Sequence, residues 1–212
     1  MTPKIFIIGA GGFGREVHQY LLDLGEASHS LAFLDDNPSA LEGFGLESPI
    51  AGPIVGHQPQ ADCQYVIALG NPLARARIAQ AFATARWVSI VHPRAYVPSS
   101  ATLGQGVVLC PGVVVGPHVR IGNHTVLNVL VNVGHDSVVG ACAVLSPHSV
   151  CNGGVELGDA AFLGTGALVL PRVKVGAKAK VSAGSVAYHD VPEGNLAMGN
   201  PARSRPLPPE DA

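Results

Sequence analysis

Aliphatic residues recur every six positions from Val91 to Val186, without one insertion or deletion. The first position of each of the sixteen hexapeptides is aliphatic except at Cys151, and the fifth position holds only Ala, Val, Thr or Ser. A period of six fits neither an α-helix nor a simple hairpin. It predicts a parallel coil that turns a corner every six residues and points one aliphatic side chain inward per face. Three faces close one turn, so Val133, Cys151 and Val169 should stack in one column.

The hydrophobic pattern of residues 1–90 is different. Continuous apolar runs, typical of parallel strands covered on both faces, predict strands over Lys4–Ile8, Leu31–Leu34, Tyr65–Leu69 and Trp87–Val91. Apolar residues at helical spacing predict a helix over Arg15–Leu24, and a second helix is expected over Leu73–Ala85. Strands that alternate with helices indicate an α/β domain with a small, Rossmann-like parallel sheet.

These patterns divide the chain into three segments: an α/β domain over residues 1–90, a parallel β-helix over 91–187 and a C-terminal tail over 188–212. The tail contains five prolines after Asp190. Because proline cannot donate to a strand ladder, we expect the tail to leave the β-helix and to wrap its surface or fray.

Composition agrees with a β-solenoid. The chain is 47% hydrophobic, only 13% charged and contains 26 glycines, which suits an aliphatic interior with tight corners. A net charge of −2 gives no reason to expect a nucleic-acid partner. Every apolar run is too short for a membrane span, and the first leads into a glycine-rich turn rather than a cleavage site. We therefore expect a cytoplasmic protein whose four cysteines are reduced.

A glycine-rich turn follows the first predicted strand. Gly9, Gly11 and Gly14 satisfy G-x-G-x-x-G, and Asp35 and Asp36 end the second strand about twenty residues further on. The start of a helix suits a phosphate, and an acidic residue suits a ribose hydroxyl. The turn could bind NAD, bind another nucleotide-containing or sugar ligand, or be structural. A domain as short as this one, beside a solenoid, argues against NAD and favours the second interpretation.

Four histidines lie well inside the repeat. His118, His124 and His148 occupy the fourth position of their hexapeptides, whereas His135 occupies the third and is followed by Asp136. A carboxylate beside an imidazole can fix its tautomer and raise its basicity, so the pair could be a general base, or His135 could be an ordinary corner residue. Ligands on adjacent turns would be separated by three whole hexapeptides. No two of the four histidines have that separation, so we expect no metal.

Positive charge is concentrated near the end of the chain. Between Arg94 and Arg172 the one basic residue is Arg120, and six basic residues then follow: Arg172, Lys174, Lys178, Lys180, Arg203 and Arg205. This cluster is either ordinary solvated surface or a site for the phosphates of a long anionic cofactor.

Five motifs together are typical of one family: Gly9-Ala10-Gly11-Gly12, Leu34-Asp35-Asp36, Ala68-Leu69-Gly70-Asn71, Gly134-His135-Asp136 and Gly199-Asn200-Pro201-Ala202-Arg203. The repeat resembles the left-handed β-helix of hexapeptide acyltransferases. The whole chain resembles the sugar acetyltransferases of the sialic acid O-acetyltransferase and nucleotide-aminosugar N-acetyltransferase family. This resemblance implies a homotrimer, with acetyl-CoA between neighbouring prisms and a sugar held by the N-terminal domain.

The resemblance also assigns roles to residues. It makes His135 the general base and Asp136 the residue that tunes it. It implies substrate binding by Gly11, Gly12, Phe13, Asp35, Asp36, Gly70, Asn71 and Asn128, with Phe13 standing where relatives often have a histidine. It implies cofactor binding by Val144, Thr165, Ala183 and Lys178, with Val144 replacing a histidine that contacts the cofactor in some relatives.

The favoured function is acetyl-CoA-dependent N-acetylation of a nucleotide-linked amino sugar in bacterial surface glycan biosynthesis. We expect direct transfer, in which His135 accepts a proton from the attacking amine and a backbone N–H stabilises the oxyanion. The alternative is O-acetylation of a sugar or sialic acid hydroxyl. A non-catalytic binding role is the third hypothesis.

Overall fold

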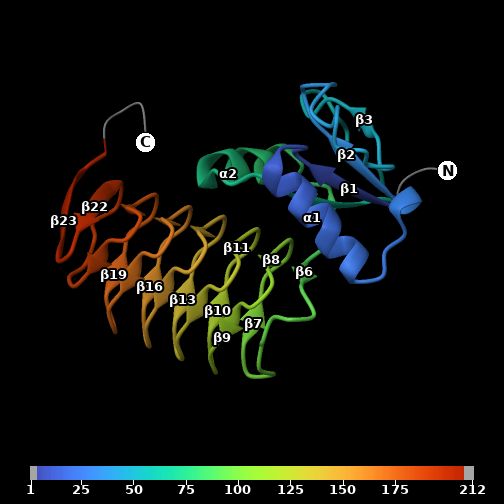
Figure 1. The fold of residues 1–212 in the computed structure, drawn as a ribbon. Helices are drawn as coiled ribbons and strands as arrows, with labels where there is room; N and C mark the ends of the chain where they lie inside the picture. The colour runs from blue at the N-terminus through green and yellow to red at the C-terminus, as the bar shows by residue number, and fades with distance from the viewer. Residues whose placement is uncertain (1–3, 208–212) are drawn as a thin grey trace.

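The computed structural model describes residues 4–207, which form a parallel sheet with two helices and a three-sided β-helix (Figure 1). The sheet has the order β3-β2-β1-β4-β5 and is parallel throughout. Its strands are β1 (Ile5–Ile8), β2 (Leu31–Leu34), β3 (Ile50–Gly52), β4 (Gln64–Ile67) and β5 (Arg86–Trp87). The expected α/β domain followed by a parallel β-helix is therefore confirmed.

Two α-helices connect the strands, and a 3-10 turn (Ser28–Ser30) precedes β2. Helix α1 (Gly12–Asp23) begins within the glycine-rich turn, earlier than expected, and Gly25 follows it with a φ of +93°. Helix α2 (Pro72–Ala81) is shorter than expected. It begins at a proline, which has no N–H to satisfy, and it ends where Phe82 leaves helical geometry to bury its ring in the core.

The β-helix has short strands that recur with the hexapeptide period around three faces. Neighbouring strands on a face are one full turn apart, and Val133 pairs with Cys151, which pairs with Val169, as expected. The second residue of each strand points inward, and the small residue two positions before it on the approach to the strand is also buried, as at Thr125 and Ala143. The hexapeptide register thus fixes which side chains form the interior.

The corners of the β-helix depend on two backbone features. From Gly106 onward, the fourth position of the hexapeptides adopts the left-handed conformation, with φ near +60° even at non-glycine residues such as Asp136 and His148. The second position is often glycine because the coils approach closely there. A Cβ on Gly122, for example, would lie 2.5 Å from the backbone nitrogen of Ala141 in the next coil.

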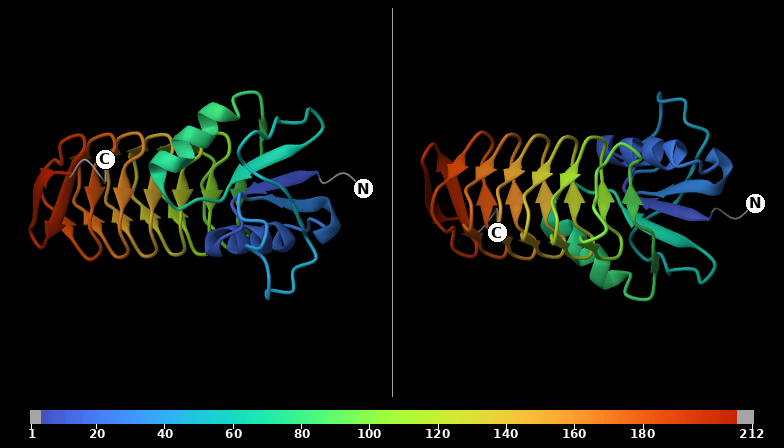
Figure 2. Two further views of the ribbon diagram at one scale, coloured as in Figure 1. Left: turned by 90° about the horizontal axis from the view of Figure 1, so that it is seen from above. Right: turned by 90° about the horizontal axis from the view of Figure 1, so that it is seen from below.

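The three faces differ in what covers them. The first face contains β6 (Ile90–Val91), β8 (Val108–Leu109), β11 (Val126–Leu127), β14 (Val144–Leu145), β17 (Phe162–Leu163) and β20 (Lys180–Val181). Its outward side chains Val108, Val126 and Val144 are nonetheless buried, because the N-terminal domain packs on this face. Figure 2 shows α2 lying along these coils from two sides.

The other two faces are open to solvent. The second face contains β9 (Val114–Val115), β12 (Asn132–Val133), β15 (Val150–Cys151), β18 (Leu168–Val169) and β21 (Val186–Ala187), and its outward residues are mainly apolar. The third face contains β7 (Thr102–Leu103), β10 (Arg120–Ile121), β13 (Val138–Val139), β16 (Glu156–Leu157) and β19 (Lys174–Val175), and its outward residues include an exposed Lys174–Glu156 ion pair.

Polar contacts join the N-terminal domain to the β-helix. Arg75 of α2 is fully buried and donates to the carbonyl oxygens of His124 (2.8 Å), Ile67 (2.7 Å) and Leu69 (3.0 Å). Burial lowers the pKa of Arg75 to about 10 and that of His124 to about 4. His92 Nε2 lies 3.0 Å from Asp23 at the end of α1. These contacts hold the two parts in one arrangement.

Two expectations about the strands were wrong. Residues Trp87–Val91 do not form one strand, because β5 pairs with β4 in the N-terminal sheet whereas β6 pairs with β8 of the β-helix. As far as Leu207 the tail does not leave the ladder, and Pro208 and Pro209 lie outside the described residues. Strand β22 (Asn195–Gly199) pairs in parallel with β20, and β23 (Ala202–Pro206) pairs antiparallel with β22. The prolines of this segment are accommodated because they lie in a corner, in the hairpin turn and at a strand end.

The cysteines form no disulfide within residues 4–207, and each is buried. In the same part of the chain no helix is long and apolar enough to cross a membrane.

Candidate active site

His135 and Asp136 form a close pair at the corner between the second and third faces, directly after β12. Nδ1 of His135 and Oδ2 of Asp136 are 2.7 Å apart, and the side chains are 66% and 62% exposed. An ionised carboxylate can only accept a hydrogen bond, so the imidazole donates from Nδ1. The Nε2 lone pair is then available to accept a proton, which is the geometry of a general base.

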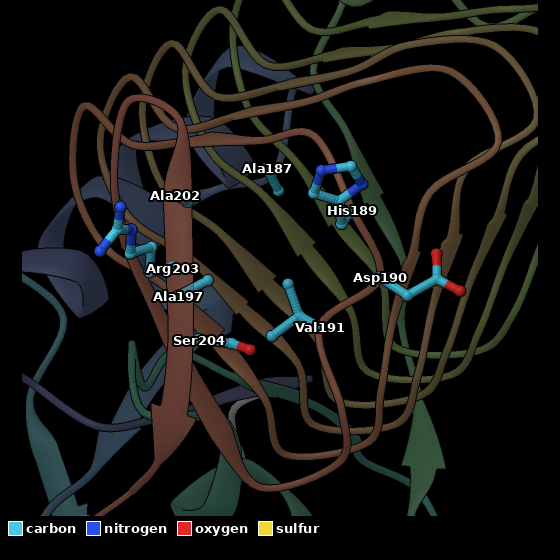
Figure 3. A pocket seen from close by; sticks show the side chains of 8 residues that line it. All are labelled: Ala187, His189, Asp190, Val191, Ala197, Ala202, Arg203 and Ser204. Carbon is cyan, nitrogen blue, oxygen red and sulfur yellow. The ribbon is translucent and has the colours of Figure 1, made fainter.

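A second His-Asp sequence provides an internal comparison. His189 and Asp190 lie nine hexapeptides, or three full turns, beyond His135 and Asp136. Here the carboxylate of Asp190 accepts from the backbone N–H of Lys174 (2.8 Å) and points away from the His189 ring (Figure 3). Both residues line a cavity of about 290 Å³ at the C-terminal end of the β-helix, together with Arg203. The sequence His-Asp alone therefore does not produce the pair seen at His135.

The glycine-rich turn has the features of an anion site at the start of α1. Gly11 is the N-cap and provides no capping side chain, and the first turn of α1 contains no acidic residue. Gly11 and Gly12 are exposed, and a Cβ on Gly11 would meet nothing within 4 Å. Gly14 is needed for a different reason, because its Cβ would overlap the carbonyl oxygen of Gly9. Backbone amides and the helix dipole thus face open space.

The two acidic residues after β2 shape the loops around this turn. Asp35 accepts from the backbone N–H of Ala10 (2.7 Å) and of Asn37 (2.9 Å). Asp36 accepts from the N–H groups of Ile54 (2.9 Å) and Val55 (3.0 Å). Asp35 therefore ties the end of β2 to the glycine-rich turn.

The structure gathers one group of the predicted substrate residues at a single edge of the sheet. Strand β1 pairs with β2 and β4 in register, so the loops that follow these strands lie side by side. Asn71 caps α2 by accepting from the N–H of Ala74, and Phe13 is half-buried against the core. The members of this group are Gly11, Gly12, Phe13, Asp35, Asp36, Gly70 and Asn71.

The predicted residues of the β-helix lie at different corners. Asn128, Thr165 and Ala183 lie between the first and second faces, and Lys178 lies between the third and first faces. The side chain of Val144 is buried on the first face. His135 stands at the corner opposite the face that the N-terminal domain covers. Within one chain, the structure therefore does not bring His135 to the glycine-rich turn.

Comparisons with known proteins cover almost the whole chain. Residues 4–82 match the PglD N-terminal domain. GDP-perosamine N-acetyltransferase of Escherichia coli is 28% identical over 208 residues, 93% of this chain and 94% of the relative.

Solved structures extend this similarity to the fold. PerB from Caulobacter crescentus, in complex with CoA and GDP-perosamine, is 31% identical with a TM-score of 0.86 over 97% of this chain and 98% of that one. The acetyltransferase domain of PglB from Neisseria gonorrhoeae, in complex with acetyl coenzyme A, is 30% identical with a TM-score of 0.86 over 98% of this chain and 100% of that one.

This chain belongs to the hexapeptide-repeat sugar acetyltransferase family. The expectations of a left-handed β-helix and of an acyltransferase are confirmed. Membership in the family also removes the support for a purely non-catalytic role.

Two further residues line the first face of this acetyltransferase: Phe162, which the sequence analysis missed, and Lys180, which it named only as a member of the basic cluster. Phe162 and Lys180 border two adjoining hollows of about 250 and 310 Å³. The first hollow reaches Gly70 and Asn71, and the second reaches Ala183. Both residues occupy the sixth hexapeptide position, which points outward, so the repeat itself contained a signal for Phe162. Among residues 4–207 no group of three or more His, Cys, Asp or Glu side chains could hold a metal ion.

Proposed function

We propose that this protein transfers the acetyl group of acetyl-CoA to the amine of a nucleotide-linked amino sugar. The observation that carries this proposal is its full-length similarity to PerB, an enzyme solved with both CoA and GDP-perosamine. The open glycine-rich turn at the start of α1 supports a nucleotide diphosphate on the acceptor. The proposal extends to a cytoplasmic role in bacterial surface glycan biosynthesis, which remains a prediction.

The chemistry we propose is direct transfer. The amine of the sugar attacks the thioester carbonyl while Nε2 of His135 accepts the proton that the amine loses. Asp136 accepts from Nδ1 and stabilises the imidazolium that forms. A backbone N–H of the β-helix stabilises the oxyanion. The C–S bond then breaks, and the CoA thiolate takes up the proton. The same base could deprotonate a hydroxyl, so O-acetylation of a sugar or sialic acid remains the alternative.

We further propose a homotrimer with active sites between subunits. The second face and the corner that precedes it expose apolar side chains that need cover, with Tyr96 62%, Leu130 52% and Val114 42% exposed. His135 lies across the prism from the glycine-rich turn of its own chain, so a complete site needs residues from a second copy. Light scattering should show a trimer at micromolar concentration, and a monomer that is fully active would contradict the proposal.

The role of His135 has a matched control within the chain. The variant His135→Ala should lose about 10²–10⁴-fold in kcat, because a positioned base contributes that much. The variant His189→Ala removes the same ring from the same hexapeptide position three turns away and should keep its activity. Both variants should unfold at the temperature of the parent. Full turnover by His135→Ala would show that another group is the base.

A further inference from the structure

At two glycines of the β-helix, Gly106 and Gly153, an added Cβ would meet an imidazole ring first. Gly106 has a φ of +65°, where a side chain is strained in any case, whereas Gly153 lies outside the left-handed region. Gly153 lies one full turn after His135, so it occupies the third hexapeptide position at the same corner of the next coil. A Cβ on Gly153 would lie 2.6 Å from both Cε1 and Nε2 of His135, and 3.1 Å from Cδ2. The nearest atoms that this Cβ would meet thus all belong to the imidazole ring.

The fold itself does not require glycine at this position. The backbone of Gly153 is outside the left-handed region, unlike that of Gly154, whose φ is +70°. A glycine in the second position, such as Gly134, is required because its Cβ would lie 2.6 Å from a backbone nitrogen of the next coil. In other coils the position equivalent to Gly153 holds residues with side chains: Ser99, Pro117, Pro171 and His189.

The imidazole would have to move if residue 153 had a side chain, because Cβ contacts under 3.0 Å essentially never occur in proteins. The backbone of His135 cannot easily shift, since its carbonyl oxygen accepts from the N–H of Gly154 at 2.8 Å. The ring would therefore have to rotate about its side-chain bonds. Such a rotation would weaken the 2.7 Å contact with Asp136 or redirect Nε2.

We propose that Gly153 is a positioning residue for His135. By having no side chain, it leaves the space in which the imidazole rests against the next coil, with Nε2 2.6 Å from where a Cβ of residue 153 would lie. Asp136, which lies at the same corner as His135, restrains the imidazole ring through Nδ1. Gly153, in the next coil, determines where the opposite side of the ring can lie. This inference rests on the proposed function, in which His135 is the base.

The test is the variant Gly153→Ala, which retains the backbone N–H and adds only a methyl group. We expect kcat to fall about 10²-fold, the loss typical of a reactive group displaced by about 1 Å, with little change in KM. In the His135→Ala background the same substitution should cause no further loss. The variant Pro171→Ala, at the equivalent position one coil further on, is the control and should keep its activity.

A spectroscopic readout separates this inference from the function on which it rests. The imidazole ¹H–¹⁵N signals of His135 are assigned by their disappearance in His135→Ala, and they should shift in Gly153→Ala. Unchanged signals would overturn the positioning role, whatever the activity. Where His135→Ala is impaired, a parent-like kcat in Gly153→Ala, or a further loss in the His135→Ala background, would also overturn it. Full activity of His135→Ala with shifted signals would instead contradict only the proposed base.

Discussion

The β-helix and the N-terminal domain bury their side chains by different rules. In the β-helix the burial of a residue follows from its place in the hexapeptide, so Leu127 and Leu145 are interior for the same reason. In the N-terminal domain burial depends on which elements pack together, so His18 of α1 is buried beside Ser48, which is distant in the chain. A short sequence period therefore specifies locally which side chains of the β-helix are buried, whereas burial in the N-terminal domain depends on its tertiary contacts.

The interface between the two parts follows neither rule. Arg75 is buried without a carboxylate and bonds to three carbonyl oxygens, one of them from the β-helix. Its Nη2 and the Nδ1 of His124 have no partner among the described residues. Buried polar groups of this kind join the two parts through specific hydrogen bonds. When one partner is removed, the other remains buried without a hydrogen bond, which lowers the stability of the fold.

The largest expected effect comes from the same substitution made in both regions. The variant Gly122→Ala places a methyl group 2.5 Å from a backbone atom of the next coil and should cost about 3 kcal/mol or more of unfolding free energy. The variant Gly12→Ala, at the exposed start of α1, should stabilise the protein by up to about 1 kcal/mol. Denaturant unfolding measures both. Equal changes in unfolding free energy for the two variants would contradict the conclusion that the β-helix and the N-terminal domain pack by different rules.

A smaller effect is expected from the variant Arg75→Met. It leaves three carbonyl oxygens without their donor, but it also relieves the burial of a charged group, so we expect a loss of about 2–3 kcal/mol. The variant Arg77→Met, on the exposed side of the same helix, should change stability by less than about 0.5 kcal/mol. If the two variants unfold alike in a thermal scan, Arg75 does not join the two parts.

The smallest effect is a pH dependence at the same interface. Burial lowers the pKa of His124 from 6.5 to about 4, so the unfolded chain binds the proton more tightly. Stability from this group is fully present above pH 6.5 and is lost as the pH falls towards 4. We expect a loss on the order of 1–2 kcal/mol between about pH 7 and pH 5.

The variant His124→Gln isolates this contribution. Burial also lowers the pKa of His18 and His57, so the parent and the variant will both lose stability in acid, and the difference between the two curves reports His124. A difference that stays constant from about pH 7 to pH 5 would show that His124 titrates normally in the folded protein.

The sequence was sufficient to predict the parts of the molecule that repeat. The column Val133, Cys151 and Val169 follows from a turn of three hexapeptides, and the strands before the glycine-rich turn and before Asp35 follow from their apolar runs. The contact between His135 and Asp136 could also be predicted from the sequence, because the side chains of adjacent residues at a corner can adopt few arrangements.

The remaining features depend on contacts that no local pattern encodes. The tail was expected to leave the ladder because of its prolines, yet β22 continues the first face, since Pro192 and Pro201 lie outside the paired positions and Pro206 is the last residue of β23. Arg75 resembles any other arginine of a surface helix until α2 lies against the β-helix. The relation of Gly153 to His135 needs the side-chain position, although their separation by one full turn was visible in the sequence.

The central claim is that this acetyltransferase acts on an amine of a nucleotide-linked sugar. Its most direct test measures thiol release from acetyl-CoA with a colorimetric reagent, using a panel of nucleotide-linked amino sugars. The matching hydroxy sugars and free sialic acid serve as controls. We predict rapid release with at least one amino sugar and none with its hydroxy counterpart. Release with the hydroxy sugars or sialic acid alone would contradict the account and identify an O-acetyltransferase.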